Sequence, residues 1–238
     1  MFKLNWKLFL NSAITQFDSF PCVFCGIQLP EKNGLCLDCH KKLPLILGER
    51  CSACGAELDG IFEVCSKCMQ EDKRIWSSAF AVYRMEGIAR ELIHKLKYNK
   101  ETAVARTLAL NTVQSIDRNF LKDVDLIVPI PLHWTRELLR GFNQSALICK
   151  FLEYFLNIPS KNILKRIKIT PKQANLTRTQ RKKNLIGVFS LKKDENYKNR
   201  TILLVDDVMT TGTTLSVASK ILLEAGASNV KVLVTARA

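Results

Sequence analysis

Two adjacent carboxylates followed by a hydroxyl-rich turn are the residues of this chain with the clearest chemical use. Asp206 and Asp207 follow the apolar run 202–205, which predicts a strand buried on both faces of a parallel sheet. The turn after them, called loop 210–214 below, consists of Thr210, Thr211, Gly212, Thr213 and Thr214. Backbone N–H groups at the start of a helix bind anions, and glycine lets a ligand approach closely. The pattern therefore predicts a ribose 5-phosphate site, with the sugar diol on the carboxylates and the phosphate in the loop.

A capped helix after a core strand is the alternative interpretation of this segment. Threonine is a good N-cap, and paired aspartates also occur in polar turns. This alternative accounts for the hydroxyls but not for two carboxylates at the end of a buried apolar strand. Open α/β sheets bind their ligands at that end of the strands, which favours the binding site.

A second predicted strand end carries prolines and arginines. The apolar strand 125–130 runs into Pro131, and a charged loop over 132–141 contains Arg136 and Arg140. Arginine makes bidentate contacts to phosphate oxygens that lysine cannot make. The segment with Pro131, Arg136 and Arg140 is therefore predicted to meet a diphosphate and is called the pyrophosphate loop below. A pair of surface arginines is the alternative.

Eight of the nine cysteines form a tandem repeat. Residues 22–39 and 51–68 share one pattern, C-x2-C followed by ten residues and a second C-x2-C. Four thiolates at this spacing form the tetrahedral sulfur site that zinc prefers in zinc ribbons. We predict two structural zinc ions, one in each repeat. The predicted ligands are Cys22, Cys25, Cys36, Cys39, Cys51, Cys54, Cys65 and Cys68.

Three other arrangements of these cysteines stay open. Disulfides need an oxidising compartment, to which nothing in the sequence directs the chain. An iron–sulfur cluster is the second alternative, although the spacing favours zinc. The third is a pairing of C-x2-C turns between the two repeats. Cys149 lies outside the repeats at helical spacing and is predicted to be a core thiol.

Strands and helices alternate after the cysteine repeats. Strands are expected at 78–83, 125–130, 163–167, 202–205 and 230–238, and helices at 86–98, 102–116, 143–156 and 215–224. Such alternation predicts an α/β fold with a mostly parallel sheet. The chain then divides into an N-terminal amphipathic helix in 1–20, a zinc-binding module in 21–75 and an α/β domain in 76–238.

The N-terminal segment resembles neither a membrane span nor a secretory signal. Phe2, Trp6, Phe9 and Leu10 fall on one side of a helix, and Asn and Lys interrupt the apolar residues. Packing on the rest of the protein is expected, with docking on a partner or a membrane surface as the alternative. The sequence has no apolar run of about 18 residues, so an integral membrane protein is not expected. We expect a cytoplasmic protein, and peripheral attachment to the inner face of the membrane stays open.

The charge of the chain is strongly positive. A net charge of +14, from 36 basic and 22 acidic residues, is typical of proteins that meet polyanions. The excess concentrates in the span 154–193, which contains no acidic residue and is expected to be helical or mobile at 177–185. Its densest cluster is Arg178, Arg181, Lys182 and Lys183. A solvated face that only confers solubility is the alternative.

The sequence ILLVDDVMTTGTTL at 202–215 resembles the phosphoribosyl pyrophosphate (PRPP) signature of the type I phosphoribosyltransferases. By this resemblance, Asp206 and Asp207 hold the ribose hydroxyls and loop 210–214 holds the 5-phosphate. PRPP with Mg²⁺ is then the implied ligand.

The order of the segments resembles a more specific family. The cysteine repeats are followed by LIHKLKY, VPIPLHWTRELLRGFNQ, PKQANLTRTQRKKNLIGVF and the PRPP-type segment. From about residue 20 to the end, this order resembles the ComF-family competence proteins. The resemblance implies a zinc module joined to a phosphoribosyltransferase-like domain. It also implies a role in handling incoming single-stranded DNA during natural transformation.

Three functions are therefore weighed. The favoured one is a binding protein for single-stranded DNA that also binds PRPP or a related ribose phosphate. In this function the DNA would be contacted by Arg178, Arg181, Lys182 and Lys183. The second is a phosphoribosyltransferase with an unidentified acceptor, for which the sequence names no catalytic residue. The third is an adaptor whose zinc module docks DNA-uptake channel or helicase components.

Overall fold

The computed structural model describes residues 20–29, 34–58, 60, 62–70, 74–99, 101–168, 187–192 and 197–238. Two predictions fall outside these residues, namely the helix in 1–20 and the basic cluster of Arg178, Arg181, Lys182 and Lys183. Within the described ranges, no helix combines the length and the apolar composition that crossing a membrane requires.

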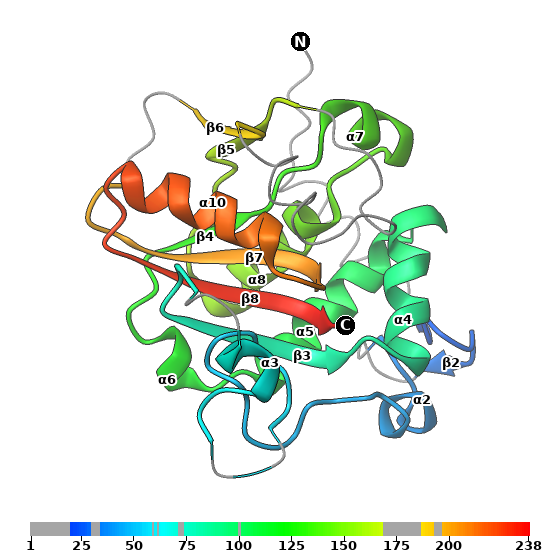
Figure 1. The fold of residues 1–238 in the computed structure, drawn as a ribbon. Helices are drawn as coiled ribbons and strands as arrows, with labels where there is room; N and C mark the ends of the chain where they lie inside the picture. Colours follow the sequence, from blue (N-terminus) through cyan, green and yellow to red (C-terminus); the bar gives the residue numbers. More distant parts are fainter. Residues whose placement is uncertain are drawn as a thin grey trace.

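A four-stranded parallel sheet forms the centre of the molecule (Figure 1). Its order is β3 (Ser78–Arg84), β8 (Asn229–Arg237), β7 (Thr201–Met209) and β4 (Leu126–Pro129). All three neighbouring pairs are parallel. Every residue of β4 is buried, as are the first five of β7, because both faces of the sheet are covered. The predicted α/β class with a parallel sheet is confirmed.

Helices cover both faces of this sheet (Figure 1). On one face Phe80 and Val82 of β3 share a core with α4 (Gly87–His94), α5 (Thr102–Ser115) and α8 (Gln144–Leu156). On the other face Ala81 and Leu204 pack with α10 (Thr213–Glu224). Smaller elements are α6 (Arg118–Leu121) and the antiparallel pair β5 (Leu164–Arg166) and β6 (Phe189–Leu191).

Three local expectations need correction. The loop expected at 132–141 contains a helix, α7 (Trp134–Arg140), which His133 caps by accepting a hydrogen bond from the Thr135 N–H and which ends at Gly141 with φ 85°. The helix expected at 86–98 changes at Lys95 into a π-helical turn, η1 (Lys95–Asn99). Strand β7 continues to Met209, so the aspartates lie within the strand and not after it. A short helix without a buried face has no apolar period to reveal it, and the two carboxylates interrupt the apolar run of β7.

The cysteine repeats pack on opposite faces of the sheet. The first contains β1 (Phe20–Pro21), β2 (Gln28–Leu29) and α2 (Leu37–Lys41), and its Cys22 and Cys39 join the core under α4, α5 and α8. The second contains α3 (Ser66–Met69), and its Cys51 and Cys54 join the core under α10. Each repeat therefore completes one side of the α/β core.

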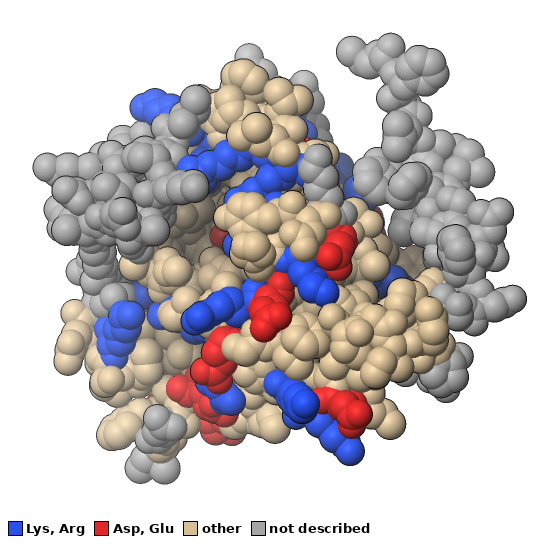
Figure 2. Space-filling view, turned by 90° about the vertical axis from the view of Figure 1, so that its right-hand side faces the viewer, with Lys and Arg blue, Asp and Glu red and all other residues tan. Residues whose placement is uncertain are grey.

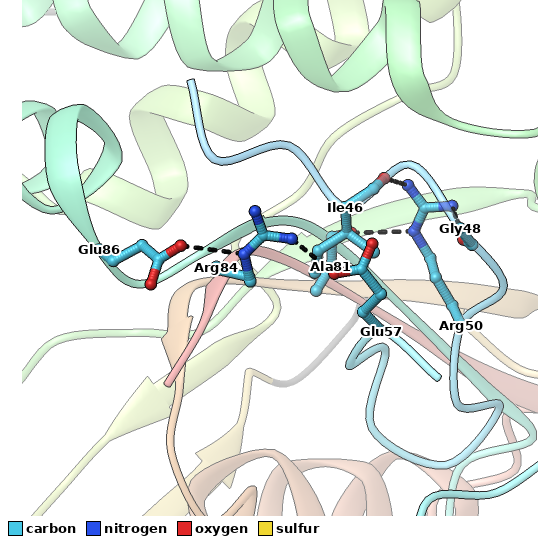
Figure 3. Close-up of polar contacts among 7 residues, drawn as sticks. All are labelled: Ile46, Gly48, Arg50, Glu57, Ala81, Arg84 and Glu86. Carbon is cyan, nitrogen blue, oxygen red and sulfur yellow. Dashed lines mark hydrogen bonds and ion pairs between the residues drawn. The ribbon is translucent and has the colours of Figure 1, made fainter. Parts of the chain in front are cut away.

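The second repeat is joined to the edge strand β3 by backbone and side-chain contacts (Figure 3). The Ala79 N–H donates to the Ser52 carbonyl at 2.8 Å. Gly55 has φ +71°, and a Cβ there would lie 2.6 Å from the Ala81 nitrogen, so only glycine fits this contact. Arg50 donates to the carbonyls of Ile46, Gly48 and Ala81. Arg84 forms ion pairs with Glu57 of the repeat at 2.5 Å and with Glu86 at 2.9 Å.

Candidate functional site

The aspartate pair lies on β7 beside the start of α8 and the π-helical turn. The Ser145 hydroxyl donates to Asp206 Oδ1 at 3.0 Å, and the Asp207 N–H donates to the same oxygen at 2.9 Å. Asp207 is buried, and its Oδ2 lies 3.0 Å from Lys97 Nζ. Three elements that are distant in sequence therefore position the two carboxylates.

The electrostatic state of Asp206 suits a ligand site. Burial and the neighbouring Asp207 carboxylate raise the pKa of Asp206 to about 7, although Lys97 and two hydrogen bonds act in the opposite direction. Asp206 is therefore about half protonated at neutral pH, because two adjacent carboxylates with little solvent repel each other. A cation or a diol that donates hydrogen bonds would favour the fully ionised pair, which matches the predicted role of these residues.

Loop 210–214 leads from β7 into the first turn of α10. Gly212 is left-handed, with φ 74°, and a Cβ there would meet the Trp76 ring at 3.1 Å and Arg74 Nη1 at 3.3 Å. The hydroxyls of Thr211 and Thr213 are 2.8 Å apart. The first N–H groups of a helix have no acceptors within that helix, so this turn supplies donors for an anion. Helix α10 starts at Thr213 and not at the expected position 215, so the loop includes the first helical turn, and its role as a phosphate site stays a prediction.

The predicted pyrophosphate loop lies at the end of the neighbouring strand β4. The Ile130 N–H donates to the Val205 carbonyl at 2.8 Å, immediately before Asp206, and Asn143 Nδ2 donates to the Ile130 carbonyl at 2.9 Å. Both loops are therefore at the carboxyl edge of one sheet. Of the predicted arginines, Arg140 donates to Gln144 Oε1 at 3.0 Å and lies over the Tyr98 ring at 5.4 Å.

Two basic residues of this site were not singled out from the sequence. Lys97 pairs with Asp207, and Arg166 of β5 is close enough to Asp206 and Arg136 to be affected by both charges. Burial and the Arg136 charge lower the pKa of Arg166, while Asp206 raises it. The segment LIHKLKY and the acid-free span contain these residues, but only the fold brings them to the aspartates.

The carboxyl edge of the sheet faces the viewer in Figure 2. Lysine and arginine side chains gather in the upper half of this face, and most of the acidic side chains lie lower. Five basic residues of the acid-free span 154–193 are among the described residues, namely Lys161, Lys165, Arg166, Lys168 and Lys192. The four predicted DNA contacts lie outside the described residues.

The thiols gather into two clusters, each within its own repeat. In the first, Cys22, Cys25, Cys36 and Cys39 bring their sulfurs within 4.8 Å of one another, and in the second Cys51, Cys54, Cys65 and Cys68 do the same. The sulfurs of Cys25 and Cys36 are 3.7 Å apart, and those of Cys54 and Cys65 are 3.8 Å apart. A tetrahedral zinc site with bonds of about 2.3 Å places its sulfurs about 3.8 Å apart. The two four-cysteine clusters therefore fit two zinc ions.

Backbone donors support thiolates in these clusters. The Cys39 N–H donates to the Cys36 sulfur at 3.4 Å, and the Cys65 N–H donates to the Cys51 sulfur at 3.4 Å. Burial alone would raise the pKa of the Cys22 thiol, but backbone hydrogen bonds lower it to about 6, while burial and the neighbouring thiols raise the pKa of Cys39 in the same cluster. Cys149 is fully buried outside both clusters, as expected of a core thiol.

Comparison with known proteins gives two matching family models. A double zinc ribbon domain matches residues 19–69, and a phosphoribosyl transferase domain matches residues 144–238. The two models correspond to the cysteine repeats and to the part of the sheet that carries the aspartates and loop 210–214.

Whole-chain relatives are also found. Competence protein F of Haemophilus influenzae is 34% identical over 229 residues, covering 93% of this chain and 99% of that protein. DNA utilization protein YhgH of Escherichia coli K12 is 30% identical over 220 residues, covering 84% and 95%. Competence protein ComFC of Bacillus subtilis is 29% identical over 205 residues, covering 83% and 81%.

Proposed function

Because the chain belongs to the ComF family of competence proteins, we propose that it binds a ribose phosphate and handles single-stranded DNA during DNA uptake. The observation that carries the ligand half is the juxtaposition of Asp206 and Asp207 with loop 210–214 at the carboxyl edge of a parallel sheet. The names of the relatives, competence and DNA utilization proteins, support the biological half.

The ligand proposed is PRPP, or a related ribose phosphate, together with Mg²⁺. The aspartates would accept hydrogen bonds from the ribose hydroxyls, and loop 210–214 would donate to the 5-phosphate. Arg136 and Arg140 follow the neighbouring strand β4 and would contact a diphosphate. Mg²⁺ binds carboxylate and phosphate oxygens, so Asp206, Asp207 and the ligand would hold it jointly.

The DNA half of the proposal depends on charge. The net charge of +14 and the acid-free span 154–193 supply an electrostatic surface for a phosphate backbone. Lysine and arginine side chains are also gathered on the face that carries the ribose phosphate site (Figure 2). Single strands bind in basic grooves with aromatic side chains, and Trp134 of α7 is exposed on the molecule.

An active phosphoribosyltransferase is the second candidate, because a phosphoribosyl transferase domain model matches 144–238. In that reaction a nucleophile attacks the anomeric carbon of PRPP, and the bond to the diphosphate breaks. Arg136 and Arg140 would then stabilise the departing diphosphate. An adaptor whose zinc module docks a DNA-uptake or helicase partner is a third candidate and is compatible with the first.

One assay separates these candidates. The purified protein is incubated with PRPP, Mg²⁺ and a panel of nucleobases, and diphosphate release is measured beside PRPP binding by calorimetry and single-stranded DNA binding. Binding of both PRPP and DNA without diphosphate release is the expected result. Diphosphate release with an acceptor and no affinity for single strands would establish the enzyme in place of the DNA-handling protein. Absence of all three activities would leave only the adaptor.

A further inference from the structure

Two arginines lie between the second cysteine cluster and the loop of the ribose phosphate site. Arg74 donates from Nη1 to the Thr211 carbonyl at 3.0 Å, and its Nη2 lies 3.9 Å from the Cys68 sulfur. One guanidinium therefore contacts both a predicted metal ligand and loop 210–214. Its plane also lies near the Trp76 ring, 5.4 Å from the ring centroid.

Arg237 makes the corresponding contact at the start of the same loop. It is buried near the end of β8, and its Nη1 donates to the Met209 carbonyl at 3.1 Å and to the Ala238 carbonyl. The same side chain is close enough to Cys54 for its charge to act on that thiol. Guanidinium groups thus hold the carbonyls of Met209 and Thr211, and that of Arg74 also contacts a sulfur of the second cluster.

A third contact connects the same two parts. Trp76 Nε1 donates to the Ala53 carbonyl inside the first C-x2-C turn of the second repeat, at 2.9 Å. The opposite edge of that indole would lie 3.1 Å from a Cβ at position 212. The left-handed Gly212 is therefore packed directly against a side chain that the second repeat positions.

Charge explains why these contacts would depend on a metal. Four thiolates around one divalent zinc leave two negative charges in excess, and two guanidinium groups match them. A buried guanidinium is stable only with anionic or carbonyl partners around it. If the metal is lost, the four sulfurs are no longer held together, and Arg74 loses the fixed position of the Cys68 sulfur that it contacts. The carbonyls of Met209 and Thr211 would then lose fixed donors.

We propose that the second metal cluster is a structural part of the ribose phosphate site: metal bound by Cys51, Cys54, Cys65 and Cys68 holds Arg74 and Arg237 in place, and these arginines preset loop 210–214 for a phosphate. The ligand-dependent part of this inference rests on the proposed function. Arg74 and Arg237 are positioning residues, since they act on the loop backbone and not on the ligand.

The first cysteine cluster contacts η1 and not loop 210–214, so its loss serves as the control for loss of the second cluster. Lys95 donates to the carbonyls of Val23 and Phe24 at 3.0 and 3.2 Å, which connects the first repeat to η1. Loss of the first metal should therefore loosen 95–99 and leave the turn 209–214 unchanged.

Backbone hydrogen exchange without any ligand tests the structural part. Exchange over 209–216 should become at least about tenfold faster in Arg74→Gln and in Cys65→Ser, since fixed donors to the loop are lost. Arg84→Gln, which removes a surface arginine bonded to the same repeat, and Cys22→Ser should leave 209–216 at the wild-type rate. Unchanged exchange in Arg74→Gln and Cys65→Ser would overturn the inference.

Zinc removal by a chromogenic chelator tests the coupling in the other direction. Coupling between two sites is reciprocal in binding free energy, so saturating PRPP with Mg²⁺ should raise the zinc affinity of one site and not of the other, as measured by competition with the chelator at equilibrium. Arg74→Gln should abolish this increase, while Arg84→Gln keeps it. Equal zinc affinities with and without PRPP, in a protein that calorimetry shows to bind PRPP, would overturn the coupling.

The two measurements also separate this inference from the proposed function. If calorimetry detects no PRPP binding but exchange over 209–216 still responds to Arg74→Gln and Cys65→Ser, the metal presets the loop for another anion and the ligand assignment fails. If PRPP binds and the loop does not respond, the function stands and the metal cluster acts on the fold alone.

Discussion

Asp206 is the residue whose environment differs most from that of an ordinary aspartate. Burial and Asp207 raise its pKa from 3.8 to about 7, so the folded protein binds this proton more tightly than the unfolded chain does. The free energy of unfolding must therefore fall as the pH rises from about 4 to about 7, and it stays lowered above that range. The ionised Asp206 carboxylate therefore lowers the stability of the folded protein at neutral pH, and perturbed carboxylates of this kind are common at ligand sites.

The first prediction follows from that sign. Asp206→Asn removes the titrating group, so its melting temperature should exceed that of the wild type at pH 8, and the difference should shrink toward pH 4. Calorimetry across this pH range measures it. Asp123→Asn is the control of opposite sign, because its hydrogen bond from Lys231 lowers the pKa of Asp123 and removing it should destabilise the protein at neutral pH. A pH-independent difference for Asp206→Asn would contradict the assignment of the proton.

The second prediction concerns the ligand. A ligand that binds only the native state stabilises it by RT ln(1 + [L]/Kd), about 2.7 kcal/mol at a concentration of 100 Kd. PRPP with Mg²⁺ should therefore raise the melting temperature of the wild type. The variant with Asp206→Ala and Asp207→Ala should show no such shift while keeping its zinc content. An undiminished shift in the double variant would place the ligand elsewhere.

At the residue scale, the sequence could point only to candidate site residues that lie next to one another in the chain. Asp206, Asp207 and loop 210–214 form one continuous segment, and the fold leaves them together. Lys97 and Ser145 reach the same carboxylates from other elements, and the Arg74 contact joins residues 137 positions apart. No local pattern encodes such contacts, since they exist only once the helices have packed on the sheet.

At the scale of elements, the cysteine repeats show what spacing can and cannot predict. The identical spacing predicted two four-cysteine sites, and the structure groups the sulfurs in that way. The spacing did not predict that one repeat packs under α4, α5 and α8 and the other under α10. Gly26 and Gly55 occupy equivalent positions, yet a Cβ would have free space at the first and would clash with β3 at the second. Equivalent repeats therefore have different structural roles.

The third prediction uses this difference. Cys22→Ser and Cys51→Ser should each lose about one equivalent of zinc, because metal binding and local folding are coupled. The PRPP-induced rise in melting temperature should be lost in Cys51→Ser, because the second cluster adjoins loop 210–214. It should only be reduced in Cys22→Ser, because the first repeat contacts η1, which carries Lys97. Elemental analysis gives the metal content. Iron in the wild type, or a single zinc in a fully metallated sample, would refute the two-zinc assignment.

Helices and strands with a clear apolar pattern were predicted from the sequence, and those without one were not. Long apolar elements such as α5, α8 and β8 were expected within a residue or two of their bounds, because burial imposes a period or a continuous run. The exposed helix α7 and the π-helical form of η1 were not predicted, and both elements adjoin the candidate site. Capping by His133 stabilises the start of α7, which has no buried residue, and Lys97 of η1 pairs with Asp207.

At the scale of the whole molecule, the zinc module and the α/β domain share their cores. Cysteines of both repeats belong to the two clusters of buried side chains that flank the sheet. The boundary predicted near residue 75 stays a prediction, and the contacts of Arg50, Arg84 and Trp76 cross it. Unfolding of the second repeat should for this reason expose part of the main core, so we expect metal loss to lower the stability of the entire protein.

Charge is the other property of the whole molecule, and it gives the last prediction. Phosphate contacts release counterions, so the logarithm of the affinity for single strands should fall with the logarithm of salt by about 0.7 per contact. Changing Arg178, Arg181, Lys182 and Lys183 to Ala should weaken binding to all sequences and reduce that slope by about two to three units, if each residue makes one contact. Titrations of a labelled oligonucleotide at several salt concentrations measure both effects. The PRPP-induced stabilisation serves as the control and should survive. Wild-type affinity and slope in the fourfold variant would show that this cluster is only a solvated face, and the DNA site would then have to be sought on the zinc module.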